Sequence, residues 1–119
     1  AYTPVSVADN KIKKSDSDMS IPLKRTTDIL KFLGENKKPG QFICGFSMET
    51  ENMLDNSRKK LEKKNADMIV ANSLVTGGAG FGTDTNIVTL ITKDNIKEYD
   101  IMSKEKVADT ILDAIINGF

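Results

Sequence analysis

The lysines of one predicted helix form the most distinctive chemical pattern in this 119-residue sequence. Lys60 and Lys64 are four positions apart, so they share one face of that helix. Lys59 and Lys63 share a neighbouring face. Two ammonium groups one helical turn apart can hold the same polyphosphate. The pattern alone favours a simpler explanation, because basic residues near a helix end interact well with its dipole and usually face solvent.

A second basic group, KIKK (11–14), lies in the polar stretch 10–18, which is typical of a loop. A lysine on a flexible loop, such as Lys11, can close over a reacting anion and neutralise the charge that develops there. A solvated surface cluster is the simpler interpretation of these residues on their own.

Two further segments can bind phosphate in principle. Thr26 or Thr27 is expected to cap a helix that runs through Leu33, with Gly34 just past its end, and the free N–H groups of the first turn can hold a nucleotide. The glycine-rich stretch TGGAGFG (76–82) matches neither the phosphate loop nor GxGxxG. It also precedes a predicted strand, so a tight turn is favoured there.

The segments that must position these residues centre on the block 41–72. QFICGF (41–46) and DMIVAN (67–72) are short apolar runs, as expected for strands buried on both faces. The helix between them, about 50–65, makes the strands parallel. Parallel sheets commonly bind ligands beyond the carboxyl ends of their strands, and Phe46 is predicted to lie at such an end.

The flanking segments complete an α/β fold. We expect extended chain at 2–8, an edge strand at 19–24, and a hairpin of 86–92 with 96–102 through the turn 93–95. Ser103 is expected to cap the last helix and Gly118 to end it. The predicted core-facing stripes of the two longer helices are Met53, Leu54, Ser57 and Leu61, then Val107, Ile111, Leu112, Ile115 and Ile116. The prediction is one domain, 1–119, with a partial Rossmann-like three-layer sheet of mixed parallel and antiparallel strands.

Composition excludes several function classes. Seventeen basic and seventeen acidic residues cancel, which argues against a general nucleic-acid binder. The sequence has no His, which excludes imidazole catalysis and most zinc sites. Cys44 is the only cysteine, and it lies in an apolar run, so we expect a buried residue in a reducing cytoplasm. No apolar run reaches membrane-spanning length.

The motifs taken together resemble the carboxyl-terminal part of phosphopantothenate–cysteine ligase, the synthetase half of the bifunctional coenzyme A biosynthesis flavoprotein. They occur in the family's order and cover nearly the whole chain. The matching motifs are KIKK (11–14), TTDIL (26–30), GFSMETEN (45–52), KKLEKKNADMIVAN (59–72), GFGTDTN (80–86) and MSKEKVADTIL (102–112). Each is weak singly, but the set is highly specific.

The resemblance implies a reaction, its substrates and its cofactors. The bacterial enzyme joins 4′-phosphopantothenate to L-cysteine with CTP and a divalent cation, usually Mg²⁺. The substrate carboxylate attacks the α-phosphate of CTP, pyrophosphate leaves, and an acyl-cytidylate forms. The cysteine amine then attacks the acyl carbon and releases CMP. The family forms homodimers, and FMN belongs only to the fused decarboxylase domain.

The resemblance also assigns site residues. Lys11 matches a lysine on a flexible loop over the reaction centre, and Phe46 matches an aromatic residue that contacts the nucleotide. Lys60 and Lys64 match two lysines that contact the nucleotide at its phosphates. Thr27 stands where many members have Pro, so backbone contacts transfer better than side-chain contacts there. The whole nucleotide-binding stretch is Thr27, Asp28, Ile29 and Leu30. No metal ligands are assigned.

One departure from the family concerns the first residue. Members carry an Asp that binds the nucleotide just before the aromatic residue aligned with Tyr2, and Ala1 stands there in this chain. We expect the chain to be the carboxyl-terminal fragment of the ligase domain, starting just past that Asp. The family's amino-terminal half, which helps to hold phosphopantothenate, is then absent, and the fragment is expected to be inactive alone.

Two other functions fit the residues. The chain can be a non-catalytic α/β interaction or dimerisation module whose lysines are merely solvated. It can also be a different nucleotide-binding enzyme of the same architecture. Binding of CTP with Mg²⁺, and its dependence on Lys60 and Lys64, separates these possibilities.

Overall fold

The computed structural model describes residues 1–73 and 85–119, so the glycine-rich stretch 76–82 and the turn predicted for it lie outside the described residues. A four-stranded sheet in the order β3-β4-β6-β7 forms the centre of the fold. Its strands are β3 (Cys44–Glu49), β4 (Met68–Ser73), β6 (Val88–Thr92) and β7 (Ile96–Glu98). The β3 and β4 strands are parallel and the other pairs antiparallel, which confirms the predicted mixed sheet.

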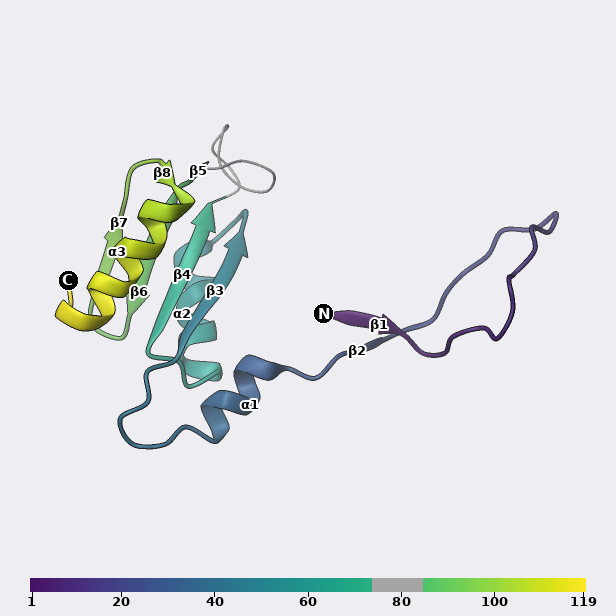
Figure 1. Cartoon of the computed structure of the whole chain (residues 1–119), viewed down its shortest axis with the longest axis horizontal. Helices are drawn as coiled ribbons and strands as arrows, with labels where there is room; N and C mark the ends of the chain where they lie inside the picture. The colour runs from purple at the N-terminus through teal and green to yellow at the C-terminus, as the bar shows by residue number, and fades with distance from the viewer. Residues whose placement is uncertain (74–84) are drawn as a thin grey trace.

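Helices cover both faces of this sheet, giving the predicted three layers (Figure 1). One face carries α2 (Met53–Lys63), which connects the two parallel strands, with the shorter α1 (Ile29–Glu35) at its end. The opposite face carries α3 (Lys104–Asn117). Strands β6 and β7 form the predicted hairpin, closed where the Thr92 N–H donates to the Asn95 carbonyl at 2.8 Å.

The core lies on the two central strands, β4 and β6, whose mostly apolar residues are buried on both faces. Successive residues of a strand point to opposite faces, so Met68 and Val70 of β4 pack on the α3 side while Ile69 and Ala71 face α2. The α3 side holds one continuous cluster of Met68, Val70, Val88, Leu90, Val107, Ile111 and Ala114. These strands hold the helices, and therefore the site, in place.

The predicted strand 41–46 is displaced by three residues. Strand β3 begins at Cys44, which pairs with Met68 of β4. The strand does not begin earlier because the Ile43 N–H donates to the Asp67 carboxylate at 2.8 Å and not to a backbone carbonyl. As an edge strand, β3 is buried on one face only, so the expectation of burial on both faces was wrong. Phe46 is therefore in the middle of its strand and 62% exposed, not at the carboxyl end.

The helices also differ in detail from the prediction. Asp28, not Thr26 or Thr27, is the N-cap of α1: its Oδ1 accepts the Lys31 N–H at 3.0 Å. Gly34 lies inside α1 and is buried. Three predicted core residues are exposed, because only a narrow stripe of each helix meets the sheet: Leu54, Leu112 and Ile116. The predicted caps of α3, Ser103 and Gly118, are confirmed.

The two strands nearest the amino terminus form a ribbon that projects away from the sheet (Figure 1). Strand β1 (Tyr2–Pro4) pairs antiparallel with β2 (Leu23–Arg25). The predicted extended stretch 2–8 and edge strand 19–24 are thus each reduced to a short piece, and the loop predicted at 10–18 has no helix or strand. The ribbon explains the elongated dimensions of 59 × 37 × 25 Å.

A third, minor sheet joins β5 (Thr85–Asn86) to β8 (Met102–Ser103). The predicted strands 86–92 and 96–102 are therefore each interrupted, because their outer residues pair with one another at the start of α3. Among the helices described, none is long and apolar enough to cross a membrane.

Candidate functional site

A cavity of about 730 Å³ lies between the start of α1, the second half of α2, the edge strand β3 and the root of the ribbon. Its size suits a small-molecule ligand. All predicted site residues except Lys11 line it: Thr27, Asp28, Ile29, Leu30, Phe46, Lys60 and Lys64. These residues come from three separate segments, and the packing of α1 and α2 beside β3 brings them together.

The orientation of α2 gives the lysines of its second half different surroundings. Ser57 and Leu61 face the sheet and are buried. Lys60 comes three residues after Ser57, and Lys64 three residues after Leu61. Both lysines therefore lie beside this buried stripe and are half-buried, whereas Lys59 is exposed. Lys60 and Lys64 therefore do not lie on a fully solvent-exposed face of the helix, which was the simpler interpretation of the sequence. Both lysines line the cavity, and their ammonium groups pair with carboxylates.

Lys64 and Asp28 form an ion pair at the cavity wall. The Lys64 Nζ donates to Asp28 Oδ2, while the other carboxylate oxygen caps α1 through the Lys31 N–H. The hydrogen bond from Lys64, followed by that from the Lys31 backbone, holds the pKa of Asp28 below its usual value of 3.8. Asp28 therefore carries a negative charge at neutral pH while it links the two helices.

Lys60 is held by a different carboxylate. Its Nζ lies 3.2 Å from Oε1 of Glu49, the last residue of β3, whose side chain is only 13% exposed. Asn56 donates to the other oxygen of Glu49 at 3.4 Å. Asn56 and Lys60 are one turn apart on α2, so together they hold the end of the edge strand against the helix. This arrangement fixes Lys60 relative to β3.

Phe46 lines the cavity from β3. It points to the same side of the sheet as Cys44, which packs against the α3 cluster, but the Phe46 side chain itself is exposed. An exposed aromatic ring on an edge strand is a suitable platform for stacking a base. Gly45 and Ser47, its neighbours, are buried on the opposite face.

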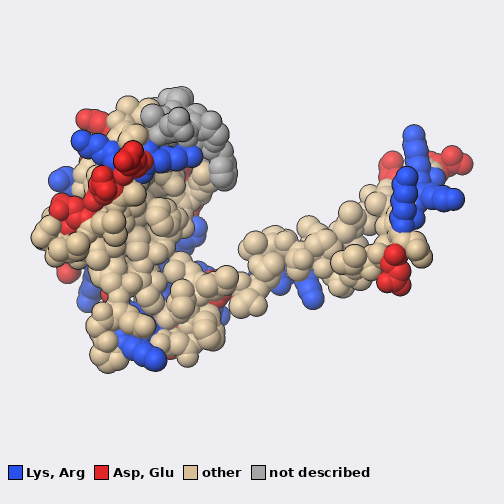
Figure 2. Space-filling model, viewed as in Figure 1, with Lys and Arg blue, Asp and Glu red and all other residues tan. Residues whose placement is uncertain are grey.

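Lys11 is not brought to the cavity. It lies in the segment that joins β1 to β2, which extends to the far end of the ribbon from the sheet (Figure 1). Basic and acidic side chains of this segment gather at that tip (Figure 2). They are Lys11, Lys13 and Lys14 with Asp9, Asp16 and Asp18.

Several lining residues were not identified from the sequence. Arg25 and Lys31 add positive charge to the cavity, and Tyr2 reaches it from the ribbon. Lys63 also contributes, although its spacing with Lys59 placed it on the neighbouring face. The additional lining residues are Ala1, Tyr2, Arg25, Thr26, Lys31 and Lys63. Their convergence depends on how the ribbon joins α1.

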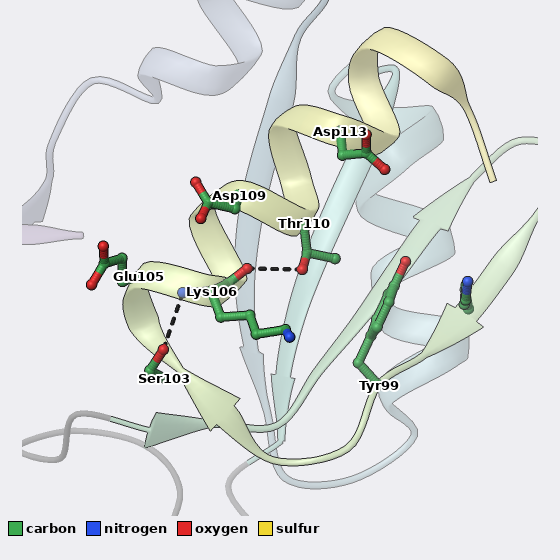
Figure 3. A pocket seen from close by; sticks show the side chains of 8 residues that line it. Tyr99, Ser103, Glu105, Lys106, Asp109, Thr110 and Asp113 are labelled. Carbon is green, nitrogen blue, oxygen red and sulfur yellow. Dashed lines mark hydrogen bonds between the residues drawn. The ribbon is translucent and has the colours of Figure 1, made fainter.

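A second cavity of about 570 Å³ lies between α3 and β7 (Figure 3). Most of its polar groups serve local structure. Ser103 Oγ accepts the Lys106 N–H at 3.1 Å, and Thr110 Oγ1 donates to the Lys106 carbonyl at 2.8 Å. The Lys97 ammonium lies 5.2 Å from the centre of the Tyr99 ring. None of the residues predicted for the site lines this cavity.

No protein cage for a metal ion is formed by the described residues. Residues 1–73 and 85–119 contain no group of three or more His, Cys, Asp or Glu side chains placed to hold one. Mg²⁺ needs no such cage, since it is usually bound through one or two carboxylates together with substrate phosphates. The cavity, which has cations and a single carboxylate on its wall, suits an anion that brings its own counter-ion.

Known proteins match this chain over almost its whole length. The C-terminal domain of DNA/pantothenate metabolism flavoproteins matches residues 1–119. The coenzyme A biosynthesis bifunctional protein CoaBC of Bacillus subtilis is 53% identical over 115 residues, which are 96% of this chain and 28% of that protein. A cysteine/cysteine sulfinic acid decarboxylase from an unknown prokaryotic organism is 43% identical over 97% of this chain and 32% of its own length. This chain thus spans less than a third of these relatives.

The fold also matches a solved structure. The crystal structure of the C-terminal domain of a coenzyme A biosynthesis bifunctional protein CoaBC superposes with a TM-score of 0.67 at 44% sequence identity. The match covers 80% of this chain and 43% of that one. The α/β architecture with a mixed sheet is shared. The chain therefore belongs to the family of DNA/pantothenate metabolism flavoprotein C-terminal domains, as its resemblance to the ligase part of the bifunctional coenzyme A biosynthesis flavoprotein predicted.

Proposed function

We propose that this chain is the CTP-binding part of a phosphopantothenate–cysteine ligase, a cytoplasmic enzyme of coenzyme A biosynthesis. One observation carries the proposal: three distant segments place Asp28, Phe46, Lys60 and Lys64 around one cavity. The family relationship supports it independently, because curated relatives matched over nearly this whole chain are bifunctional coenzyme A biosynthesis proteins.

Each wall of the cavity suits a different part of CTP. Lys60 and Lys64 are assigned to the phosphates, whose charge a pair of ammonium groups one turn apart can neutralise. Phe46 is assigned to the base, by stacking. The stretch from Thr27 to Leu30 is assigned to the nucleoside, largely through its backbone. Both lysines already pair with carboxylates, so binding requires the phosphates to compete with Asp28 and Glu49.

The proposed reaction uses these groups to activate a carboxylic acid. The carboxylate of 4′-phosphopantothenate attacks the α-phosphate of CTP, and pyrophosphate leaves as the acyl-cytidylate forms. The amine of L-cysteine then attacks the acyl carbon, and CMP leaves. The contribution of this chain is to hold CTP in line and to offset the charge that builds on phosphorus. Mg²⁺ is expected to accompany the phosphates.

Lys11 is proposed to act as a mobile catalytic lysine. It lies in a ribbon loop that is remote from the cavity of its own chain, so it must move or reach another site to act. The chain spans less than a third of its relatives, and the wall that holds phosphopantothenate is proposed to lie in the remainder. We accordingly expect these 119 residues to bind CTP without completing the reaction.

The ribbon is proposed to form the contact of a homodimer. Its apolar side chains are more than half exposed, which is unusual for so many residues in one segment. They are Tyr2, Val5, Val7, Ile12, Met19, Ile21 and Leu23. The same exposure favours the second candidate function, a non-catalytic interaction or dimerisation module.

Calorimetric titration of CTP with Mg²⁺ separates these functions. The wild-type chain should bind CTP, and the double variant Lys60→Ala/Lys64→Ala should lose roughly a hundredfold in affinity, since each lost charged contact is worth on the order of tenfold. Binding that this double change leaves intact would refute the lysine site. Absence of binding in a longer protein that includes the preceding residues would favour the interaction module, and preference for ATP would indicate a different enzyme.

A further inference from the structure

The position of α1 is not explained by burial of apolar side chains. This helix has only seven residues, too few to be stable alone in water. Ile29, Phe32 and Leu33 are 68%, 58% and 48% exposed. Gly34 is its one buried residue. Leu30 is the one large apolar side chain of α1 that is partly buried, so a further contact is needed to fix α1, and with it the cap residue Asp28, at the cavity.

Gly34 makes the closest approach between α1 and α2. A Cβ atom at this position would overlap the carbonyl oxygen of Lys64 and lie 2.8 Å from its carbonyl carbon. Asn65, the next residue, has a left-handed conformation with φ of 52° and donates from Nδ2 to the Gly34 carbonyl at 2.9 Å. The contact involves backbone on both sides, so no side-chain rotation can make room for a larger residue.

Lys64 therefore contacts both ends of α1. Its carbonyl oxygen lies against Gly34 in the last turn, and its ammonium group binds Asp28, the cap that precedes the first turn. We call this backbone contact between Gly34 and the Lys64 carbonyl the Gly34 seat. It sets the distance that the Lys64 side chain must span to reach Asp28. A shift of α1 by the width of a methyl group would change that pairing and the wall of the cavity.

A second glycine lies beneath the other end of the helix. A Cβ atom on Gly45 of β3 would be 2.8 Å from Leu30 Cδ2 and 3.1 Å from Ile69 Cδ1. The nearer neighbour is the end of the flexible, partly buried Leu30 side chain, which can turn aside, whereas the buried Ile69 must shift by only a few tenths of an ångström. Gly45 is consequently a tolerant contact, in contrast to Gly34.

We propose that Gly34 is a positioning residue for the site, holding Asp28 and the rest of the α1 start in register with Lys64 through its backbone contact. The part of this proposal that concerns the nucleotide rests on the proposed function. The seat itself does not, because it concerns only how α1 packs on α2. Helix propensity alone predicts the opposite effect for Gly34→Ala, because Ala is the better helix former and would stabilise an isolated helix.

The test compares Gly34→Ala with Gly45→Ala and with Glu35→Ala, an exposed change in the same helix, all in the complete natural protein that carries this sequence. Amide hydrogen exchange is measured along α1 and β4, together with CTP affinity in the presence of Mg²⁺. In Gly34→Ala we expect the α1 amides to exchange at least tenfold faster, the β4 amides to keep their protection, and CTP affinity to fall at least tenfold. Gly45→Ala should change the exchange of the α1 amides within threefold, and Glu35→Ala should change neither quantity.

The outcomes distinguish the seat from the proposed function. Unchanged exchange of α1 in Gly34→Ala would overturn the seat whatever happens to CTP. Faster exchange with unaltered CTP affinity would overturn the positioning role while the proposed function stands. If the wild-type protein fails to bind CTP, the proposed function fails, and the exchange rates alone then decide the seat: faster exchange confined to α1 supports it.

Discussion

Lys64 and Asp28, 36 positions apart in the sequence, meet at the cavity through a hydrogen bond from Nζ to Oδ2. The same carboxylate caps α1. The side chain of the residue that caps the end of α2 therefore binds the residue that starts α1, and the pair forms part of the cavity wall.

The ionisation of Asp28 should depend on Lys64. Because the hydrogen bond from Lys64 favours the carboxylate, the pKa of Asp28 should lie below 3.8 in the wild type and rise in Lys64→Met. A depressed pKa contributes stability that is present at pH values above 3.8 and is lost as the pH falls through the lower, folded-state value. Carbon-detected NMR titration of the Asp28 carboxyl group measures both values.

Lys59→Met is the matched control for this titration, since Lys59 is exposed on the neighbouring face. It should leave the titration curve of Asp28 in place. Identical Asp28 curves in wild type and Lys64→Met would show that the pair does not persist in solution.

Lys60 and Lys59 should differ in their effect on CTP. Lys60 lines the cavity and is held by Glu49, whereas its neighbour Lys59 points to solvent. Lys60→Met should weaken CTP binding about tenfold, near the low end for a lost charged contact because the side chain is 42% exposed. Lys59→Met should stay within twofold at the same ionic strength. Equal losses from both would mean that only the summed charge of α2 matters.

Much of the fold was predictable because its signals are local. The apolar runs of β4 and β6, the hairpin between β6 and β7, and the caps at Ser103 and Gly118 each follow from neighbouring residues. The parallel pairing of β3 with β4 followed from the helix between them. The start of β3 did not, because the Ile43 N–H donates to the side chain of Asp67 and not to a backbone carbonyl, a contact between distant positions.

The candidate site was predictable in composition but not in arrangement. The spacing of Lys60 and Lys64 left solvated and functional interpretations open, and the burial of Ser57 and Leu61 beside them places both lysines at the cavity. Gly34 was expected to end a helix, since glycine commonly does so. Its place inside α1 depends on the approach of the Lys64 carbonyl, which no local pattern encodes.

Ser47 and Ser57 should stabilise the contact between β3 and α2. Their hydroxyl groups are 3.1 Å apart, and the residues are 4% and 0% exposed. Ser57→Ala should lower the free energy of unfolding by about 1–3 kcal/mol, because it leaves the buried Ser47 hydroxyl without this bond. Chemical denaturation of Ser47→Ala, Ser57→Ala and the double variant measures the coupling.

The double variant should be less destabilised than the sum of the single variants, since residues in contact are not additive. Ser17→Ala, in the exposed ribbon loop, should stay within about 0.5 kcal/mol of wild type. Strict additivity in the cycle would rule out an energetically important bond between the two hydroxyls.

Lys11→Gln should affect the reaction more than the binding of CTP. The lysine lies away from the cavity, so its proposed role is in a closed state that exists during reaction. In the complete enzyme, kcat should fall at least tenfold while the Kd of CTP stays within threefold. Lys13→Gln in the same loop is the control and should change neither. A parallel loss of kcat and CTP affinity in Lys11→Gln would instead place Lys11 in the resting nucleotide site.

Phe46 should recognise the base and not the phosphates. Base–aromatic stacking is worth about 1–3 kcal/mol by alanine substitution, so Phe46→Ala should weaken CTP binding by roughly five- to a hundredfold. Inorganic triphosphate lacks the base, and its affinity should stay within twofold in this variant. Because the side chain is 62% exposed, the free energy of unfolding should change by less than about 1 kcal/mol.

Phe46→Tyr keeps the aromatic face and should retain CTP affinity within threefold, which separates stacking from simple apolar contact. Lys60→Met gives the complementary pattern, since it should weaken triphosphate and CTP alike. If Phe46→Ala reduced the affinity for both ligands equally, the ring would be supporting the lysines and not the base. The two variants together thus assign each wall of the cavity to one part of the nucleotide, with calorimetric titration of both ligands as the single measurement required.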